Sequence, residues 1–371
     1  MKPLSIVFVG LSLSSSWGNG HATTYRALLS GLGRLGHKVL FLEREQPWYV
    51  QNRDLAEPGY CTLRFYGSVG DLAAHAEALT AADAVIVGSY VPDGIEVIDA
   101  IAALGPRLLC FYDIDTPVTL ARLARGEETY VAPRQLRAFD ICFSFSGGRA
   151  LEILRREFGV RRAEPLFCSV DAEAYRASGE AKRWDLGYLG TYSPDRQPAL
   201  DELLLRTAAL MPDRRFVVAG PQYPATIRWP DNVERLEHLP PEMHASFYSR
   251  QRYTLNVTRS DMIATGWSPS VRLFEAAACA TPVISDRWDG LGDFFPEPEA
   301  IATAARAEDV AAVLSRPSAE AAGQGLAARR IVLARHTGLV RATELAAVLA
   351  DEPVETIHVP TPSTETHHAA R

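Results

Sequence analysis

Short apolar runs alternate with amphipathic stretches along the first part of the chain. Five runs have the length and residue types of buried strands, at 5–9, 39–42, 84–87, 107–112 and 141–145. The stretches between and after them space their apolar residues as helices do, near 22–35, 71–78, 92–102, 116–124 and 149–157. Alternating strands and helices are typical of a parallel sheet covered on both faces. The pattern predicts a Rossmann-like, doubly wound unit.

The same alternation resumes further along the chain. Strands are expected at 185–190, 216–219, 233–236, 253–257 and 283–285, and helices at 200–210, 242–250 and 268–279. We place the boundary between the units near 170–183. The fold class is therefore α/β, with two Rossmann-like doubly wound domains over 1–170 and 183–335. The polar, Pro-containing residues 360–371 are expected to form a disordered tail.

Composition agrees with two domains and excludes some partners. A chain of 371 residues with 47% hydrophobic content can bury two cores. Its formal charge of −7 gives no general attraction to nucleic acid, which we do not expect as a partner. Five widely spaced cysteines suggest reduced thiols in the cytoplasm, where we expect the protein to be located. The apolar start runs into a strand and loop rather than a signal peptide, and no run is long enough to span a membrane.

The segment 268–286 carries the strongest local signal. Ser268 is a good N-cap and Pro269 suits the first helical position, so a helix is expected to run to Cys279 before a short strand. The free N–H groups of its first turn could bind an anion. Glu275 follows Ser268 by seven residues, or about 10 Å along a helix, which a diphosphate and its nucleoside could span. Alternatively, Arg272 and Glu275 form only a surface ion pair.

This segment resembles the donor-binding signature of the group 1 glycosyltransferases. The similar stretch is Glu275-Ala-Ala-Ala-Cys-Ala-Thr-Pro-Val-Ile284, and its Ser-Pro-Ser-Val-Arg-Leu-Phe-Glu lead-in is most similar to the branch related to the spore-maturation protein CgeB. The resemblance implies the GT-B architecture of two facing Rossmann-like domains, with Glu275 holding the ribose of a nucleotide-sugar. It also implies that a helix at 336–355 crosses back to brace the first domain. Two positions depart from the signature: Trp267 stands where the family has its first acid, and Ala280 where it has glycine.

Loops at the carboxyl ends of the second set of strands are expected to form the donor site. The loop from Gly190 to Arg196 resembles the family's glycine-to-lysine phosphate loop, and an arginine can grip phosphate through two hydrogen bonds. The alternatives are a solvated cation at a helix start for Arg196 and a surface charge for Arg259. The complete set of donor-binding candidates is Gly190, Thr191, Arg196, Gly220, Gln222, Arg259, Ser268, Ser270, Arg272 and Glu275.

Two residues of the first unit are candidates for catalysis. His21 lies at an expected helix N-terminus, which suits a hydrogen-bonding or basic role, although it could be a cap without chemistry. Asp113 and Asp115 follow an expected strand, and Asp113 could accept a proton from an acceptor hydroxyl, whereas Asp115 is favoured as a helix cap. An Asp-x-Asp metal site is conceivable, but the resemblance argues against it. We expect no metal and no cofactor beyond the nucleotide-sugar.

The sequence therefore predicts a metal-independent glycosyltransferase. Its donor would be a nucleoside-diphosphate sugar bound by the second domain, and an acceptor of unknown identity would bind the first domain. The resemblance leans towards retention of configuration at the anomeric carbon. Two alternatives stay open: an epimerase that acts on a nucleotide-sugar with the same fold, and a non-catalytic nucleotide-sugar-binding or coat-associated protein.

Overall fold

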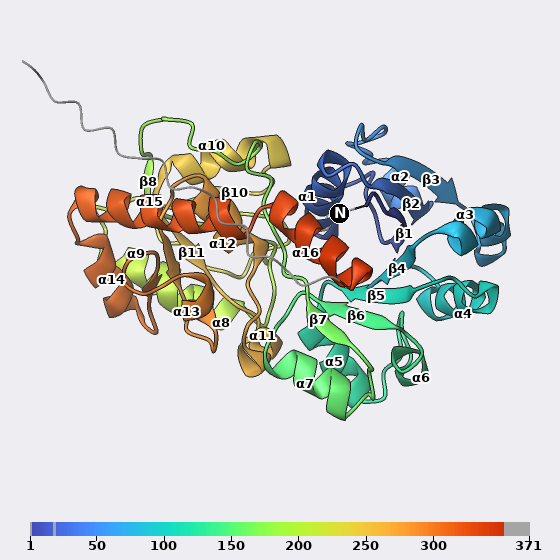
Figure 1. Cartoon of the computed structure of the whole chain (residues 1–371). Helices are drawn as coiled ribbons and strands as arrows, with labels where there is room; N and C mark the ends of the chain where they lie inside the picture. The colour runs from blue at the N-terminus through green and yellow to red at the C-terminus, as the bar shows by residue number, and fades with distance from the viewer. Residues whose placement is uncertain (1, 18–19, 352–371) are drawn as a thin grey trace, which may run out of the picture.

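A seven-stranded parallel sheet forms the first domain of the computed structural model, which describes residues 2–17 and 20–351 (Figure 1). The strands lie in the order β3-β2-β1-β4-β5-β6-β7. They are β1 (Ser5–Gly10), β2 (Lys38–Arg44), β3 (Thr62–Tyr66), β4 (Ala84–Gly88), β5 (Leu109–Asp113), β6 (Ile141–Ser144) and β7 (Ala163–Pro165). The helical segments are α1 (His21–Arg34), α2 (Pro47–Val50), η1 (Val69–His75), α3 (Ala76–Ala81), α4 (Gly94–Leu104), α5 (Thr116–Ala124), α6 (Pro133–Leu136) and α7 (Arg149–Arg156).

The second domain is built on a six-stranded parallel sheet in the order β10-β9-β8-β11-β12-β13. Its strands are β8 (Trp184–Leu189), β9 (Phe216–Ala219), β10 (Val233–Leu236), β11 (Gln251–Asn256), β12 (Val283–Ser285) and β13 (Ala302–Thr303). Its helical segments are α8 (Gln197–Leu200), η2 (Asp201–Leu205), α9 (Arg206–Leu210), η3 (Pro241–Met243), α10 (His244–Ser249), α11 (Ser260–Thr265), α12 (Val271–Ala278), α13 (Leu291–Phe294), α14 (Ala307–Leu314) and α15 (Ser318–Arg335).

Both faces of the first sheet are buried. Along β1, Val7 and Val9 pack into one hydrophobic cluster, whereas Ile6 and Phe8 pack into another on the opposite face. Successive side chains of a strand point to opposite faces, so a strand covered on both sides must be apolar throughout. This is why the strands read as continuous apolar runs in the sequence.

The last helix, α16 (Gly338–Ala350), packs on the first domain although it follows the second in sequence (Figure 1). Ala342 and Leu345 are buried in the first-domain cluster that contains α1. At the crossing, an added Cβ on Gly31 would lie 2.4 Å from the Gly338 carbonyl oxygen. The two helices can therefore approach this closely only because small residues line the crossing.

The structure confirms the predicted fold class of two Rossmann-like domains and most of the expected elements. Three strands were not predicted: β3, which alternates exposed and buried residues at the edge of the sheet, and the very short β7 and β13. The expected tail, 360–371, lies outside the described residues. Within the described part of the chain, none of the helices is both long enough and apolar enough to cross a bilayer.

Candidate donor site and facing histidine–carboxylate pair

Helix α12 begins two residues later than the sequence predicts. Its N-cap is Ser270 rather than Ser268, because residues 268–270 lie outside the helix and Ser270 itself is extended. The Ser270 hydroxyl does not cap the helix but donates to Asn256 Oδ1 at 2.8 Å. Ser268 Oγ instead lies 2.7 Å from Ser146 Oγ of the first domain. Of these two serines, Ser270 therefore lies nearer the helix end, and Ser268 lies at the domain junction.

Arg272 and Glu275 do not form the surface ion pair considered above. Both are buried, and each has its own partner. Arg272 Nε donates to the Leu189 carbonyl at 2.7 Å, and its Nη1 donates to Asn256 Oδ1 at 2.9 Å. Glu275 Oε2 accepts a hydrogen bond of 2.9 Å from the Tyr248 hydroxyl. A buried charge needs such partners, so this pair belongs to a built site rather than a solvated face.

Three arginines of the second domain, Arg196, Arg259 and Arg272, are close enough for their charges to influence one another. Arg196, at the N-cap of α8, is half-buried, and its Nε is buried without a partner among the described residues. Burial is the main cause that lowers the pKa of Arg196, and the positive charges of Arg272 and Arg259 lower it further. In the part of the chain that the structure describes, no carboxylate forms an ion pair with any of the three. Their combined charge favours an anion.

Two glycine loops close the edge of the sheet beside these cations. A Cβ on Gly190 would lie 3.0 Å from Arg272 Nη2, and a Cβ on Gly220, which has φ +137°, would lie 2.1 Å from the Gly190 carbonyl oxygen. Thr191 is exposed, and its carbonyl accepts a hydrogen bond of 2.9 Å from Arg196 Nη2. Gln222 is also exposed and has a left-handed φ of 69°. Because these two positions carry no side chain, the loops can pack closely against each other and against Arg272.

Facing them from the first domain is a histidine–carboxylate pair. His21 begins α1, and its Nε2 lies 3.9 Å from Oδ2 of Asp115. Burial would raise the pKa of Asp115, but its interaction with the nearby His21, together with the charge of Arg259, lowers it. Asp115 occupies the N-cap position of α5 but makes no capping hydrogen bond with its side chain. Its carboxylate is therefore directed to His21, with Arg259 of the second domain within electrostatic range.

Asp113, the carboxylate favoured from the sequence, lies deeper than Asp115. It is only 3% exposed, and its Oδ1 accepts a hydrogen bond of 3.0 Å from the backbone N–H of Asp115. Burial raises its pKa to about 7, against the lowering effect of hydrogen bonds from Thr119 and Asp115. Asp113 thus supports the loop that holds Asp115.

The two domains also contact each other directly. The Gly147 N–H donates to the Trp267 carbonyl at 2.9 Å, and an added Cβ on Gly148 would collide with the Trp267 ring at 2.3 Å. Trp267 has a left-handed φ of 42°, and its Nε1 donates to Asp293 at 2.7 Å. The residue that replaces the family's first acid is therefore a packing element between the domains.

Asn256 is a central residue of this site that the sequence reasoning missed. It is fully buried at the carboxyl end of β11, where its Oδ1 accepts from Ser270 and Arg272 and its Nδ2 donates to Ser285 at 2.9 Å. An asparagine that ends an apolar strand at this edge was the available signal. Among the described residues, His, Cys, Asp and Glu nowhere gather in a group of three that could hold a metal ion.

The two facing Rossmann-like domains, with cations at the carboxyl edge of the second sheet, define the GT-B fold class of glycosyltransferases. Solved structures agree over nearly the whole chain. HepE from Anabaena, solved with UDP and glucose, has 13% identity and a TM-score of 0.67, covering 94% of this chain and 99% of that one. Sucrose-phosphate synthase from Thermosynechococcus elongatus has 13% identity and a TM-score of 0.68, covering 94% and 98%. AviGT4, a glycosyltransferase involved in avilamycin A biosynthesis, has 18% identity and a TM-score of 0.61, covering 94% and 98%.

The second domain also matches a sequence family. Residues 196–347 match the family described as Glycosyl transferase-like, and this range includes Arg196, Arg259, Arg272 and Glu275. No curated protein is similar to the chain at a significant level. The family match and the fold of the whole chain both support a glycosyltransferase.

Proposed function

We propose that this protein transfers a sugar from a nucleoside-diphosphate sugar to an acceptor hydroxyl, and that it does so without a metal ion. The observation that carries this proposal is the convergence of Arg196, Arg259 and Arg272 opposite the His21–Asp115 pair. Three cations that form no ion pair with a carboxylate of residues 2–17 and 20–351 suit a diphosphate, whose charge grows as the sugar leaves. HepE, solved with UDP and with UDP-glucose, makes the uridine nucleotides the first donors to test.

Within this site each group has a proposed task. Arg196 and Arg272 neutralise the departing diphosphate, and Glu275 holds the ribose hydroxyls. His21 contacts the acceptor hydroxyl, with Asp115 fixing the orientation of its ring, and binding both substrates in one cleft supplies the remaining rate enhancement. As in other proteins with a histidine–carboxylate pair, the carboxylate also stabilises the protonated ring.

The Arg196→Gln variant tests the donor site. We expect it to weaken binding of UDP and UDP-glucose, measured by calorimetry, by roughly 1.5–3 kcal/mol, because a hydrogen-bonded charge pair is lost. Arg215→Gln is the matched control, since Arg215 is exposed just before the amino end of β9, away from this edge. Equal affinities for wild type and Arg196→Gln would contradict the assignment of the cation cluster to the donor.

Metal independence is tested with a chelator. The three arginines and the helix end would do the work that a divalent cation does elsewhere, so turnover measured as UDP release should be unchanged in EDTA. Loss of turnover that magnesium or manganese restores would contradict this and would return Asp113 and Asp115 to consideration as metal ligands.

The stereochemical outcome separates two candidate mechanisms. Similarity to the group 1 enzymes favours retention, which we take as the first candidate. The His21–Asp115 contact favours inversion as the second, because a general base that takes the acceptor proton permits one direct displacement. The anomeric configuration of the product, measured by NMR, distinguishes them.

Turnover of donor without an acceptor into an epimeric nucleotide-sugar would instead indicate an epimerase. Binding of the donor without any turnover would indicate a non-catalytic protein.

A further inference from the structure

Two of the six tryptophans stand out because they expose about half of their surface. Trp17 is 53% exposed and Trp48 is 48% exposed, whereas Trp184 and Trp288 are buried. An exposed indole leaves a large apolar surface in water, and aromatic side chains are enriched where proteins bind partners. Trp48 packs edge-to-face on its neighbour Tyr49, with ring centroids 6.0 Å apart, yet about half of its surface stays exposed.

Both tryptophans follow the carboxyl ends of strands of the first sheet, the edge at which the proposed acceptor chemistry occurs. Trp17 follows β1 and Trp48 lies in α2 just after β2, and these strands are neighbours in a parallel ladder. The segments are also joined to each other: Ser15 Oγ donates to the Asn52 carbonyl at 2.7 Å, and the Asn52 side chain donates to the Trp48 carbonyl at 2.7 Å. The segments that carry the two tryptophans are therefore held together by hydrogen bonds.

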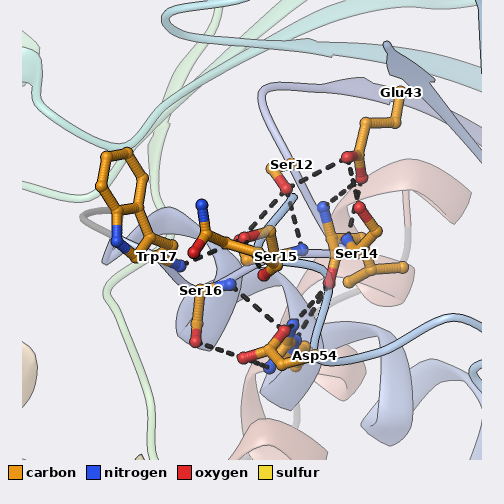
Figure 2. A network of polar contacts seen from close by, with 10 residues as sticks. Ser12, Ser14, Ser15, Ser16, Trp17, Glu43 and Asp54 are labelled. Atoms are coloured by element: carbon orange, nitrogen blue, oxygen red, sulfur yellow. Dashed lines mark hydrogen bonds and ion pairs between the residues drawn. The ribbon is translucent and has the colours of Figure 1, made fainter. Parts of the chain in front are cut away.

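The segment that carries Trp17 is fixed from beneath by a buried carboxylate. Glu43, which is 1% exposed, accepts hydrogen bonds from the backbone N–H groups of Leu13 at 2.7 Å and Ser14 at 2.9 Å, and from the Ser12 and Ser14 hydroxyls (Figure 2). Figure 2 shows the Trp17 indole lying to one side of this network and pointing away from it. A supporting network of this kind holds a binding side chain in place before the ligand arrives.

The charges around the two rings are balanced. Arg26 bonds to Asp54, which also accepts from the Ser16 hydroxyl, and Arg53 pairs with Glu45 at 3.4 Å. The rim therefore has no excess positive charge to attract an anionic lipid surface, and it is polar rather than a continuous apolar patch. Two exposed rings, with Val50 also exposed close to Trp48 in the sequence, in an otherwise polar rim suit a ligand that has both an apolar face and many hydroxyls.

We propose that Trp17 and Trp48 form a stacking site for a sugar ring of the acceptor, so that the acceptor of this enzyme is itself a carbohydrate. The proposal rests on the proposed function. A pyranose ring presents C–H groups to the negative face of an indole while its hydroxyls point to the rim. Trp17 precedes His21 by four residues, so their Cα atoms are within about 14 Å of each other. A sugar ring that covers Trp17 can therefore belong to the same acceptor molecule as the hydroxyl that reaches His21.

The test measures oligosaccharide binding in the presence and in the absence of UDP. The probes are maltotriose, cellotriose and xylotriose, observed by saturation-transfer NMR and by quenching of tryptophan fluorescence. We expect at least one to bind, and Trp17→Ala and Trp48→Ala each to weaken it by about tenfold, the scale of one lost aromatic contact. Trp17→Phe should retain most of the affinity, and UDP affinity should stay within about twofold throughout. Leu210→Ala removes an exposed apolar residue of the second domain and is the control.

Several results would overturn the stacking site. These are no binding of any trisaccharide by the wild type, trisaccharide binding that is indifferent to both tryptophan variants, and binding of phosphatidylglycerol vesicles or of p-nitrophenol that depends on Trp17 in place of sugar binding. Failure of the proposed function has a separate signature, which is wild-type protein that does not bind nucleotides. In that case, carbohydrate binding that depends on Trp17 would still support the subsite.

Discussion

Asp113 and Asp115 are two residues apart and have opposite electrostatic surroundings. Asp113 is enclosed, and burial raises its pKa to about 7. Asp115 is close to His21 and Arg259, whose charges outweigh the effect of burial on its pKa. One carboxyl is therefore partly protonated near neutral pH, whereas the other is an anion that can orient a histidine. Residues that are close in the fold, rather than in the sequence, decide which carboxyl takes up a proton and which stays an anion.

The raised pKa of Asp113 predicts a stability change with pH. An unfolded aspartate has a pKa of about 3.9, so the folded state binds the extra proton between about pH 4 and pH 7. The stabilisation that protonated Asp113 gives the folded state is fully present below about pH 4 and is lost as the pH rises through about 7. We expect Asp113→Asn to be more stable than wild type by about 1 kcal/mol at pH 8, with the difference shrinking towards pH 5, in urea unfolding. The exposed Asp213→Asn serves as control, and a difference that does not change with pH would contradict the prediction.

Residue-level sequence reasoning succeeded where a residue follows from a local pattern. Arg196 was placed at a helix start and His21 at the N-terminus of α1, and both lie there. The role of Asp115 could not be read in the same way, because the pairing with His21 joins two segments that are ninety-four positions apart (115 − 21) and meet only when β1 and β5 enter one sheet. Asn256 was missed because its partners lie on α12, outside its own strand.

At the scale of elements, the crossing of α1 and α16 depends on glycine. An added Cβ at Gly338 would lie 2.0 Å from the Ala27 carbonyl oxygen, which belongs to the backbone and cannot move independently. We expect Gly338→Ala to destabilise the protein by about 1–3 kcal/mol, as overpacking does, and to lower the melting temperature measured by calorimetry. Gly323→Ala is the matched control: it lies within α15, has open space around it, and should be neutral or slightly stabilising. Equal melting temperatures for the two variants would refute the tight crossing.

Element boundaries show where sequence patterns reach their limit. Strand β9 begins and ends at the residues that the sequence predicts, 216 and 219, because a buried parallel strand is apolar throughout. Helix α12 starts later than the Ser-Pro pattern predicts, because Ser268 is engaged by Ser146 across the domain boundary. A helix cap is a local preference, and here a tertiary hydrogen bond outweighs it. The edge strand β3 was missed because its outer face is polar.

At the scale of the whole molecule, His336 is buried where the chain leaves the second domain for the first. Its ring stacks on Phe274 with centroids 4.6 Å apart, and its Nδ1 lies 2.6 Å from Arg341 Nη2. The backbone of the inter-domain segment runs beside it, because Val170 forms a bridge with Thr337. Burial, and then the charge of Arg341, lower the pKa of His336 to about 2.

This lowered pKa predicts acid sensitivity at the junction. The unfolded histidine has a pKa of about 6.5, so below that pH the unfolded state binds the extra proton and stability falls, by up to about 1.4 kcal/mol per pH unit. His336→Gln keeps an acceptor for Arg341 and removes this proton. Between pH 7 and pH 5 the wild type should lose more stability than His336→Gln, and the exposed His238→Gln should behave as wild type. Parallel pH profiles for wild type and His336→Gln would show that the histidine does not titrate on unfolding.

The position of α16 also has a consequence for how the protein is made. The face of α1 that α16 covers belongs to the first domain, yet the residues that cover it are the last described part of the chain to leave the ribosome. During synthesis the amino-terminal sheet can form early, but its apolar helix stays open to water until translation has passed residue 350. The nascent protein thus exposes this apolar face of α1 for most of its synthesis. We expect a ribosome-associated chaperone to bind there until α16 covers it.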